Sequence, residues 1–352
     1  MLRVADGGPV GLIHRDRIFL QAGQSSDPTE LFSIRTDPGN ARCQALVIPG
    51  NPGAAAYYTP FMQRLYEAFG GGIDVYSLSQ LGHDSSGGNT GQVFTLQQQI
   101  QHKVAFLREH MLLPGRPPIV ILGHSIGSYI ALHAAHQIEQ ELHANTSDSL
   151  SGLPGIVQIL AIFPFLTVDP SCPRQRFLRA TASWAFLIGH AAQLVGRLPV
   201  SLQRWIIQRY TQNLDPHALE ATLGLFQRHT ATNAFYLAQH EFKDLAAPAD
   251  WWLLERYGRR VAALCAPSDM WFPEHQQEEM LLKVPKIQVH RMKDQRHDFC
   301  VSEKLSAMLA ENANRQPEGQ QRRPLPVVKS EFGGERKSEG YWQRELAVGF
   351  LL

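Results

Sequence analysis

The chain has 352 residues, a length that suits one large α/β domain with an insertion, or two small domains. Its 33 Lys and Arg nearly balance its 32 Asp and Glu, so no basic excess argues for a nucleic-acid partner, and we expect none. The four cysteines lie far apart without a C-x-x-C pair, so we expect neither a zinc site nor a disulfide framework. No apolar run is long enough to span a bilayer, and the first residues lack the apolar segment of a secretory signal.

Apolar runs and helical periodicities alternate through the first half of the chain. We predict strands at residues 45–48, 73–78, 119–122 and 156–163, and helices at residues 59–69, 96–111 and 126–136. Strands that alternate with helices indicate βαβ units and a parallel sheet. The expected fold class is therefore α/β, with a mostly parallel central sheet flanked by helices.

The alternation stops between residues 165 and 250, where the periodicity is mostly helical. It resumes with predicted strands at residues 261–265 and 286–290 and predicted helices at residues 274–282 and 301–310. We therefore divide the chain into N-terminal strands and loops (1–43), a first part of the core (44–164), a helical cap insertion (165–250), a second part of the core (251–310) and a disordered tail (311–352). The apolar end of the tail, residues 341–352, either forms a short docking helix or frays.

The strongest chemical motif is Gly123-His124-Ser125-Ile126-Gly127, a G-x-S-x-G between a predicted strand and a predicted helix. This context is typical of a nucleophile elbow, a sharp turn that exposes a serine hydroxyl above the sheet. Gly123 and Gly127 supply the small side chains that such a turn needs. The alternative is an ordinary strand-to-helix turn in which Ser125 only caps the helix.

A serine nucleophile needs a base, and the base needs a third group to orient it. On this fold the expected chain order is serine, acid, histidine. Asp269 follows the predicted strand 261–265, and His297 follows the predicted strand 286–290, so both lie where parallel sheets place their sites. The competing candidates are His83 and His290 for the base, and Asp294 and Asp298 for the acid.

An oxyanion hole needs two backbone N–H groups. Ile126, directly after the nucleophile, supplies one. The loop Pro49-Gly50-Asn51-Pro52-Gly53 follows an early strand, and because proline has no N–H, Asn51 is the predicted second donor. The alternative is a turn rich in Pro and Gly that binds no ligand.

The motifs together resemble the lipid droplet-associated hydrolases. The resemblance is carried by Val47–Gly53, Tyr57–Phe61, Leu81–His83, Gly123–Tyr129, Phe163–Pro164, Asn233–Leu237 and Arg296–Phe299. It implies an α/β-hydrolase fold with a Ser-Asp-His triad. We expect no cofactor, since the triad chemistry requires none, and no metal, since the sequence has no H-E-x-x-H or comparable motif. The resemblance also implies ester hydrolysis of neutral lipids, such as cholesteryl esters, at lipid droplets and the endoplasmic reticulum.

The cap insertion carries a run of large apolar side chains with arginines at its ends. The apolar residues are Trp184, Phe186, Leu187, Ile188, Leu194 and Val195, and the arginines are Arg176, Arg179 and Arg197. Such a segment is suited to dip into a phospholipid monolayer, with the arginines near headgroups. The alternative is that these residues pack over the sheet. The family resemblance favours peripheral association with the cytosolic face of droplets and of the endoplasmic reticulum.

The sequence thus predicts a serine lipase or esterase, acting on neutral lipid through an acyl-enzyme, in droplet turnover or storage. Two other hypotheses stay open. One is a droplet-surface protein that keeps the fold and works mainly by binding lipid or partners. The other is thioester or amide cleavage by the same residues.

Overall fold

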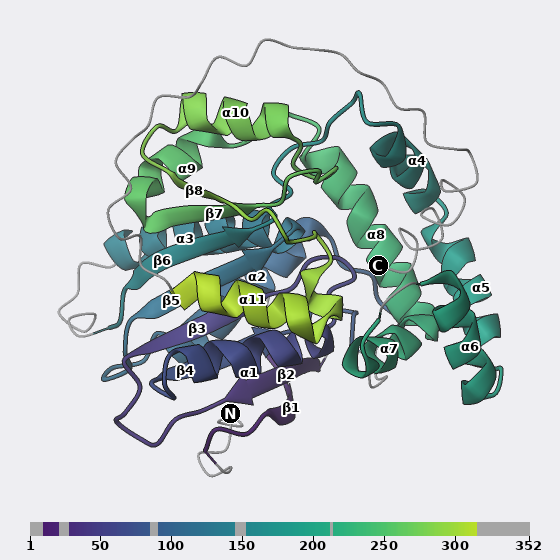
Figure 1. Cartoon of the computed structure of the whole chain (residues 1–352), viewed down its shortest axis with the longest axis horizontal. Helices are drawn as coiled ribbons and strands as arrows, with labels where there is room; N and C mark the ends of the chain where they lie inside the picture. Colours follow the sequence, from purple (N-terminus) through teal and green to yellow (C-terminus); the bar gives the residue numbers. More distant parts are fainter. Residues whose placement is uncertain (1–9, 21–27, 85–90, 145–152, 212–213, 315–352) are drawn as a thin grey trace.

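The computed structural model of the protein describes residues 10–20, 28–84, 91–144, 153–211 and 214–314, and most of these build one eight-stranded sheet with helices around it (Figure 1). The strands lie in the order β1-β2-β4-β3-β5-β6-β7-β8. Their bounds are β1 His14–Ile18, β2 Thr29–Ile34, β3 Cys43–Ile48, β4 Ile73–Leu78, β5 Ile119–His124, β6 Ile156–Ile162, β7 Val261–Cys265 and β8 Gln288–Arg291. β1, β2 and β4 pair antiparallel, and the other neighbours are parallel. The predicted α/β class with a mostly parallel sheet is confirmed.

The central strands are buried on both faces, which is why they read as continuous apolar runs. In β3, Ala45 and Val47 join one apolar core, whereas Leu46 and Ile48 join the core on the opposite face. Successive side chains of a strand point to opposite sides, so a strand covered twice needs apolar residues at every position. This pattern fixes the sheet as the middle layer of the molecule.

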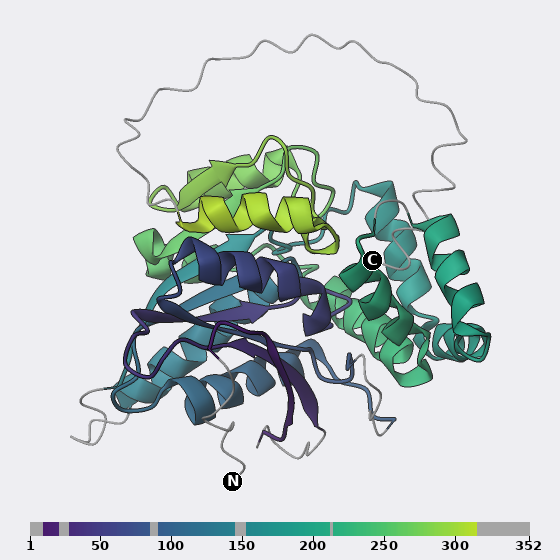
Figure 2. The same ribbon diagram turned by 60° about the horizontal axis from the view of Figure 1, so that its bottom comes forward.

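Two sets of helices cover the faces of the sheet. The first set consists of α1 Thr59–Ala68 and α11 Glu303–Asn314, and the second of α2 Leu96–Phe106, α3 Ile126–Ala144, α9 Trp251–Tyr257 and α10 Glu274–Lys283. α1 and α11 lie side by side on one face, and α2 and α3 on the other (Figures 1 and 2).

Most of the segment between β6 and β7, before α9, forms a helical cap beside the carboxyl ends of the parallel strands (Figure 2). Its helices are α4 Pro173–Ala182, α5 Ala185–Gly196, α6 Val200–Tyr210, α7 Pro216–Leu223 and α8 Arg228–Asp244. α5 packs closely on α8 because Gly189 has no side chain, and a Cβ there would lie 2.0 Å from Thr232 Oγ1. α8 lies between the core and the outer helices α5 and α6 (Figure 1).

The chain's end departs from the predicted boundary. α11 continues to Asn314, inside the range assigned to the tail, because Ala313 still packs against the core. The prediction for the rest of the tail, residues 315–352, lies outside the described residues. Within the described ranges, no helix combines the length and the apolar character needed to cross a bilayer.

Candidate active site

Ser125 occupies a sharp turn between β5 and α3. Its φ is +54°, in the left-handed region that non-glycine residues adopt at a cost. The turn leaves no room for side chains beside it: a Cβ on Gly123 would lie 2.3 Å from the Gly127 carbonyl oxygen, and one on Gly127 would lie 2.3 Å from the Ile48 carbonyl oxygen. Both glycines of the motif are therefore required by backbone contacts, as the elbow interpretation predicts.

Backbone hydrogen bonds hold Ser125 in this conformation. Its amide donates to the Ile162 carbonyl over 3.0 Å, and its carbonyl accepts from the amides of Ser128 (2.9 Å) and Phe165 (3.2 Å). These partners come from β6, α3 and the segment that leads into the cap. The strained turn is thus fixed by the surrounding fold. The start of α3 directly after Ser125 favours negative charge at this point.

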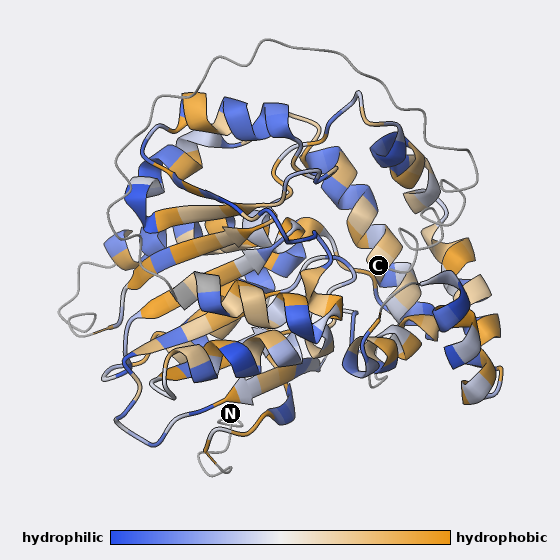
Figure 3. Ribbon diagram, in the orientation of Figure 1, coloured by the Kyte–Doolittle hydropathy of each residue, from blue (hydrophilic) through white to orange (hydrophobic). Residues whose placement is uncertain are grey.

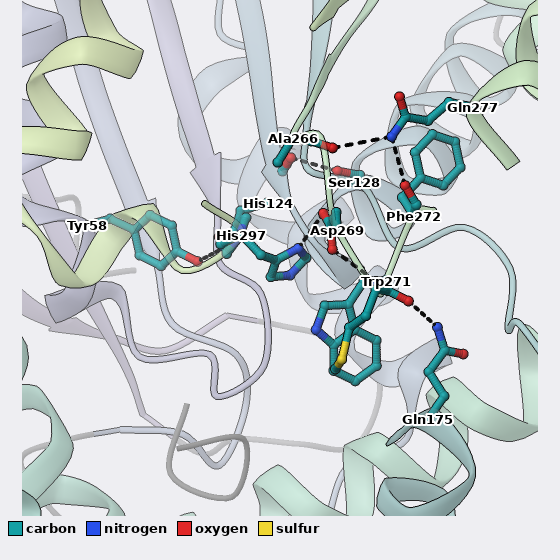
Figure 4. Close-up of polar contacts among 12 residues, drawn as sticks. Tyr58, His124, Ser128, Gln175, Ala266, Asp269, Trp271, Phe272, Gln277 and His297 are labelled. Atoms are coloured by element: carbon teal, nitrogen blue, oxygen red, sulfur yellow. Dashed lines mark hydrogen bonds and ion pairs between the residues drawn. The ribbon is translucent and has the colours of Figure 1, made fainter. Parts of the chain in front are cut away.

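Asp269 and His297 meet beside the elbow (Figure 4). The His297 Nδ1 atom lies 2.8 Å from Asp269 Oδ2, and the other carboxylate oxygen accepts the Trp271 amide over 2.9 Å. The Asp269 side chain is almost fully buried. A carboxylate accepts at Nδ1, so the His297 tautomer carries its proton there and leaves Nε2 with a free lone pair. This is the arrangement that a general base requires.

The loop that carries Asp269 is tied to two helices (Figure 4). Gln277 of α10 donates to the carbonyl oxygens of Ala266 and Phe272, over 3.3 and 2.9 Å. Gln175 of the cap helix α4 donates to the Met270 carbonyl over 2.7 Å. These amide groups hold the acid in place from both the core and the cap.

The residue before the nucleophile, His124, links the elbow to the His297 loop. Its Nε2 lies 2.8 Å from the His297 carbonyl oxygen, and its Nδ1 lies 2.6 Å from the Tyr58 hydroxyl. Burial lowers the pKa of His124 well below its ordinary value, and the neighbouring His297 lowers it further. His124 is therefore a neutral imidazole at physiological pH.

Two backbone amides of the loop after β3 already donate hydrogen bonds to protein side chains. Gly50 N–H donates to the Tyr58 hydroxyl over 2.9 Å, and Gly53 N–H donates to His83 Nδ1 over 2.8 Å. Pro52 has no N–H. Asn51 remains as the residue of this loop whose amide can serve a ligand.

The Asn51 side chain is held by the cap. Its Nδ2 donates to the Ala234 carbonyl and to Glu241 Oε1, both over 2.9 Å and both on α8. Burial raises the pKa of Glu241 to about 8, although the bond from Asn51 works in the opposite direction. The cap helix α8 thus holds the candidate oxyanion loop, residues 49–53, through a largely protonated carboxyl group.

The other residues considered for the base and the acid have different contacts or exposure. His83 is fully buried and serves Gly53, and burial together with the Lys103 charge lowers its pKa to about 3. His290 lies within β8, before the strand's last residue Arg291, and not in the loop that follows. Of the two competing acids, Asp298 pairs with Arg296 and Asp294 is exposed.

The sequence analysis assigned no role in the site to three residues that lie near it. Tyr58 and Glu241 contact the elbow and the oxyanion loop, and Phe163 has a φ of +43° with its ring 6.4 Å from that of His297. Tyr58 and Phe163 lie in motifs that carry the family resemblance, so those motifs were an available signal. Glu241 had none, because its partner is 190 positions away in the chain.

Comparison with known proteins identifies the family. A sequence profile described as lipid-droplet associated hydrolase matches residues 41–300, which is most of the chain. The chain belongs to the lipid-droplet associated hydrolase family. The family's rat member is 25% identical over 287 residues, covering 76% of this chain and 83% of its own. The human member is 25% identical over 258 residues, covering 68% and 74%.

Solved structures with similar folds are α/β-hydrolase enzymes. A soluble variant of monoglyceride lipase from Saccharomyces cerevisiae aligns with a TM-score of 0.53 at 14% identity, covering 84% of this chain and 94% of its own. A haloalkane dehalogenase loop variant from Bradyrhizobium elkanii aligns with a TM-score of 0.59 at 10% identity, covering 86% and 95%. These likenesses establish the predicted α/β-hydrolase fold of this family member.

Proposed function

We propose that this family member is a serine ester hydrolase that acts on neutral lipids, of the cholesteryl ester or acylglycerol type, at lipid droplets. The proposed catalytic residues are Ser125, Asp269 and His297, with the amides of Asn51 and Ile126 as the oxyanion hole. The observation that supports this most is the 2.8 Å contact between His297 and Asp269, beside a serine held at a φ of +54°. The proposed reaction needs no cofactor or metal.

The proposed reaction has two steps. Ser125 Oγ attacks the ester carbonyl as His297 Nε2 takes its proton, and the amides of Asn51 and Ile126 stabilise the oxyanion. His297 then returns the proton to the leaving alcohol, which gives an acyl-enzyme. Water attacks this ester with the help of the same base and releases the acid. Asp269 holds the imidazole in the required tautomer and stabilises its charge.

The cap surface supports a lipid interface as the place of action. On α5, Phe186, Leu187 and Leu194 are more than half exposed along one helix face, and the opposite face packs on α8 through Gly189. Trp184 and Trp205 extend the exposed apolar surface at 62% and 59%. Figure 3 shows apolar residues on these outer helices. Exposed apolar side chains gathered in this way are typical of interaction surfaces.

We further propose that this surface enters the phospholipid monolayer of droplets and the cytosolic face of the endoplasmic reticulum. The exposed Arg176 and Arg179 lie on α4 and the exposed Arg197 directly follows α5, so the three flank the apolar run and can meet headgroup phosphates. The relatives' names associate those proteins with lipid droplets, which supports the same location here.

The catalytic proposal is tested with Ser125→Ala. We expect turnover of a soluble ester to fall by at least about a thousandfold, as in other triad knockouts, with no loss of folding. A fluorophosphonate probe should label Ser125 in the wild-type protein and nothing in the variant. Folded wild-type protein that resists labelling would favour the lipid-binding hypothesis. Lipid profiling of cells with either form then identifies the natural ester.

The interface proposal is tested by flotation with triolein emulsions coated with phospholipid. We expect the triple variant Trp184→Ser, Leu187→Ser, Leu194→Ser to lose most binding. Leu282→Ser is the matched control, because Leu282 is 82% exposed but lies on α10, outside the cap. Equal flotation of the triple variant and the control would exclude this surface as the lipid contact.

A further inference from the structure

Three buried contacts connect the oxyanion loop to the loop of the proposed base. Gly50 N–H donates to Tyr58 Oη over 2.9 Å, Tyr58 Oη lies 2.6 Å from His124 Nδ1, and His124 Nε2 lies 2.8 Å from the His297 carbonyl oxygen. Tyr58 and His124 are almost fully buried, at 1% and 5% exposed. The three contacts join the loop after β3, the turn Ala55–Tyr58 before α1, the end of β5 and the loop after β8.

The proton positions along this series follow from the chemistry of its ends. A carbonyl oxygen only accepts, so His124 Nε2 must carry a proton to donate to His297. Because His124 is neutral, its Nδ1 then has a lone pair and must accept, so the Tyr58 hydroxyl donates to it. Gly50 N–H in turn donates to the Tyr58 oxygen. Every hydrogen bond therefore has one possible direction.

The surroundings keep His124 neutral. The rings of Phe299, Phe163 and Tyr58 lie edge-on to its imidazole, with centroids 5.0, 6.4 and 5.8 Å away. The ionisable groups that face this part of the site are His297, with a ring centroid 5.0 Å from that of His124, and Cys300, whose thiol contacts Tyr58. Burial raises the pKa of Cys300 to about 12, so it stays a neutral thiol.

We propose that His124 and Tyr58 are positioning residues, which hold the backbone of His297 against the nucleophile turn and set the distance between base and serine. The proposal rests on the proposed serine hydrolase function. Asp269 orients the His297 ring, but a ring bond alone does not fix the position of the loop that carries it. His124 supplies that restraint from the residue next to Ser125.

The same three hydrogen bonds connect the proposed oxyanion loop to the proposed base. Gly50, at its start, directly precedes Asn51, and a Cβ on Gly50 would lie 3.1 Å from Ser125 Cβ and 3.2 Å from His124 Nδ1. The oxyanion loop therefore touches both the nucleophile and its neighbour. A loss of either side-chain partner is expected to misalign base and oxyanion donor together, which lowers kcat while leaving KM nearly unchanged.

Tyr58→Phe removes the hydroxyl and keeps the ring. We expect kcat for a soluble nitrophenyl ester, and the rate of fluorophosphonate labelling at Ser125, to fall about tenfold. Tyr57→Phe is the matched control: Tyr57 is equally buried, but its hydroxyl bonds to Thr222 of the cap, outside this series. Its labelling rate should stay close to that of the wild type.

His124→Phe removes both bonds, and we expect kcat to fall about a hundredfold, the scale of a displacement of about 1 Å in an active site. His124→Gln keeps an N–H near the Nε2 position and should recover part of this loss. If His124→Phe fails to fold, the glutamine variant and Tyr58→Phe carry the test.

An NMR measurement, which does not depend on catalytic activity, completes the test. In protein labelled with ¹⁵N-histidine, the His124 signals, assigned through the glutamine variant, should show the neutral tautomer with the proton on Nε2 from about pH 5.5 to about pH 9. Titration in this range, or a proton on Nδ1, would overturn the proposal. So would wild-type labelling rates in both Tyr58→Phe and His124→Gln. If the wild-type protein does not label at all, the hydrolase function fails, and the tautomer still decides whether the restraint exists.

Discussion

Glu241→Gln is expected to stabilise the protein, and increasingly so as the pH rises. Glu241 lies on α8 with 4% of its surface exposed, and it accepts a hydrogen bond from Asn51 through Oε1. Burial raises its pKa to about 8 from an ordinary value of 4.5. A glutamine has the same shape and keeps the accepting Oε1, but it cannot ionise. The substitution therefore removes the cost of ionisation and preserves the contact.

The direction in which Glu241 changes stability with pH follows from proton release on unfolding. Below about pH 4.5 the carboxyl is protonated in both states and has no effect on stability. Between about pH 4.5 and about pH 8 the folded state keeps a proton that the unfolded chain releases, so stability falls as the pH rises. Above about pH 8 both states are ionised and the cost is complete. At about 1.4 kcal/mol per pH unit, the cost approaches about 5 kcal/mol.

The assay is urea unfolding followed by tryptophan fluorescence at about pH 5, about pH 6.5 and about pH 8.5. We expect the stability difference between Glu241→Gln and wild type to widen by a few kcal/mol across this series. Glu255→Gln is the control, because Glu255 is exposed on α9 and its loss should change stability by less than about 0.5 kcal/mol at each pH. A difference for Glu241→Gln that stays constant with pH would show that the carboxyl is ionised in the folded protein.

Further substitutions test the elbow, the acid and a buried lysine. Gly127→Ala should prevent correct folding, since its Cβ would lie 2.3 Å from the Ile48 carbonyl oxygen, whereas Gly155→Ala has open space and should leave the melting temperature nearly unchanged. Asp269→Asn should lower kcat by about 10⁴-fold in ester assays without unfolding the protein, because it favours the wrong His297 tautomer. Burial holds the pKa of Lys103 well below its ordinary value of 10.5, so this residue costs more stability as the pH falls below that value, and the stability difference between Lys103→Met and wild type should widen as the pH is lowered in urea titrations.

The sequence located the core strands well because they are apolar at successive positions. The predicted strands 73–78 and 261–265 have the same bounds as β4 and β7. β1 and β2 were not located individually. In β2, Thr29–Ile34, three polar residues interrupt the apolar ones although the whole strand is buried. In β1, at the sheet edge, residues His14–Ile18 are mostly exposed and polar. Such a strand is stabilised by its partner, here β2, and carries no apolar periodicity of its own.

The candidate site was predictable where each residue follows an apolar strand. Ser125, Asp269 and His297 lie just after β5, β7 and β8, so the chain order and the parallel sheet were enough to bring them to one edge. The residues that surround them were not predictable in this way. Tyr58 and His124 are 66 positions apart, and their contact depends on how the turn Ala55–Tyr58 lies against the end of β5. No local pattern encodes that distance.

The pH dependence of activity would separate the groups around the candidate site. His83 and His124 are buried and stay neutral because their pKa values are lowered, so neither should contribute a rise in activity between about pH 5 and about pH 7. Glu241 is the group near the oxyanion loop whose pKa of about 8 lies within the working range. Its ionisation would place a negative charge beside Asn51, which opposes the oxyanion. We therefore expect wild-type kcat to decline above about pH 8 and Glu241→Gln to lose that decline, and identical profiles above this pH would show that the charge does not reach the reacting carbonyl.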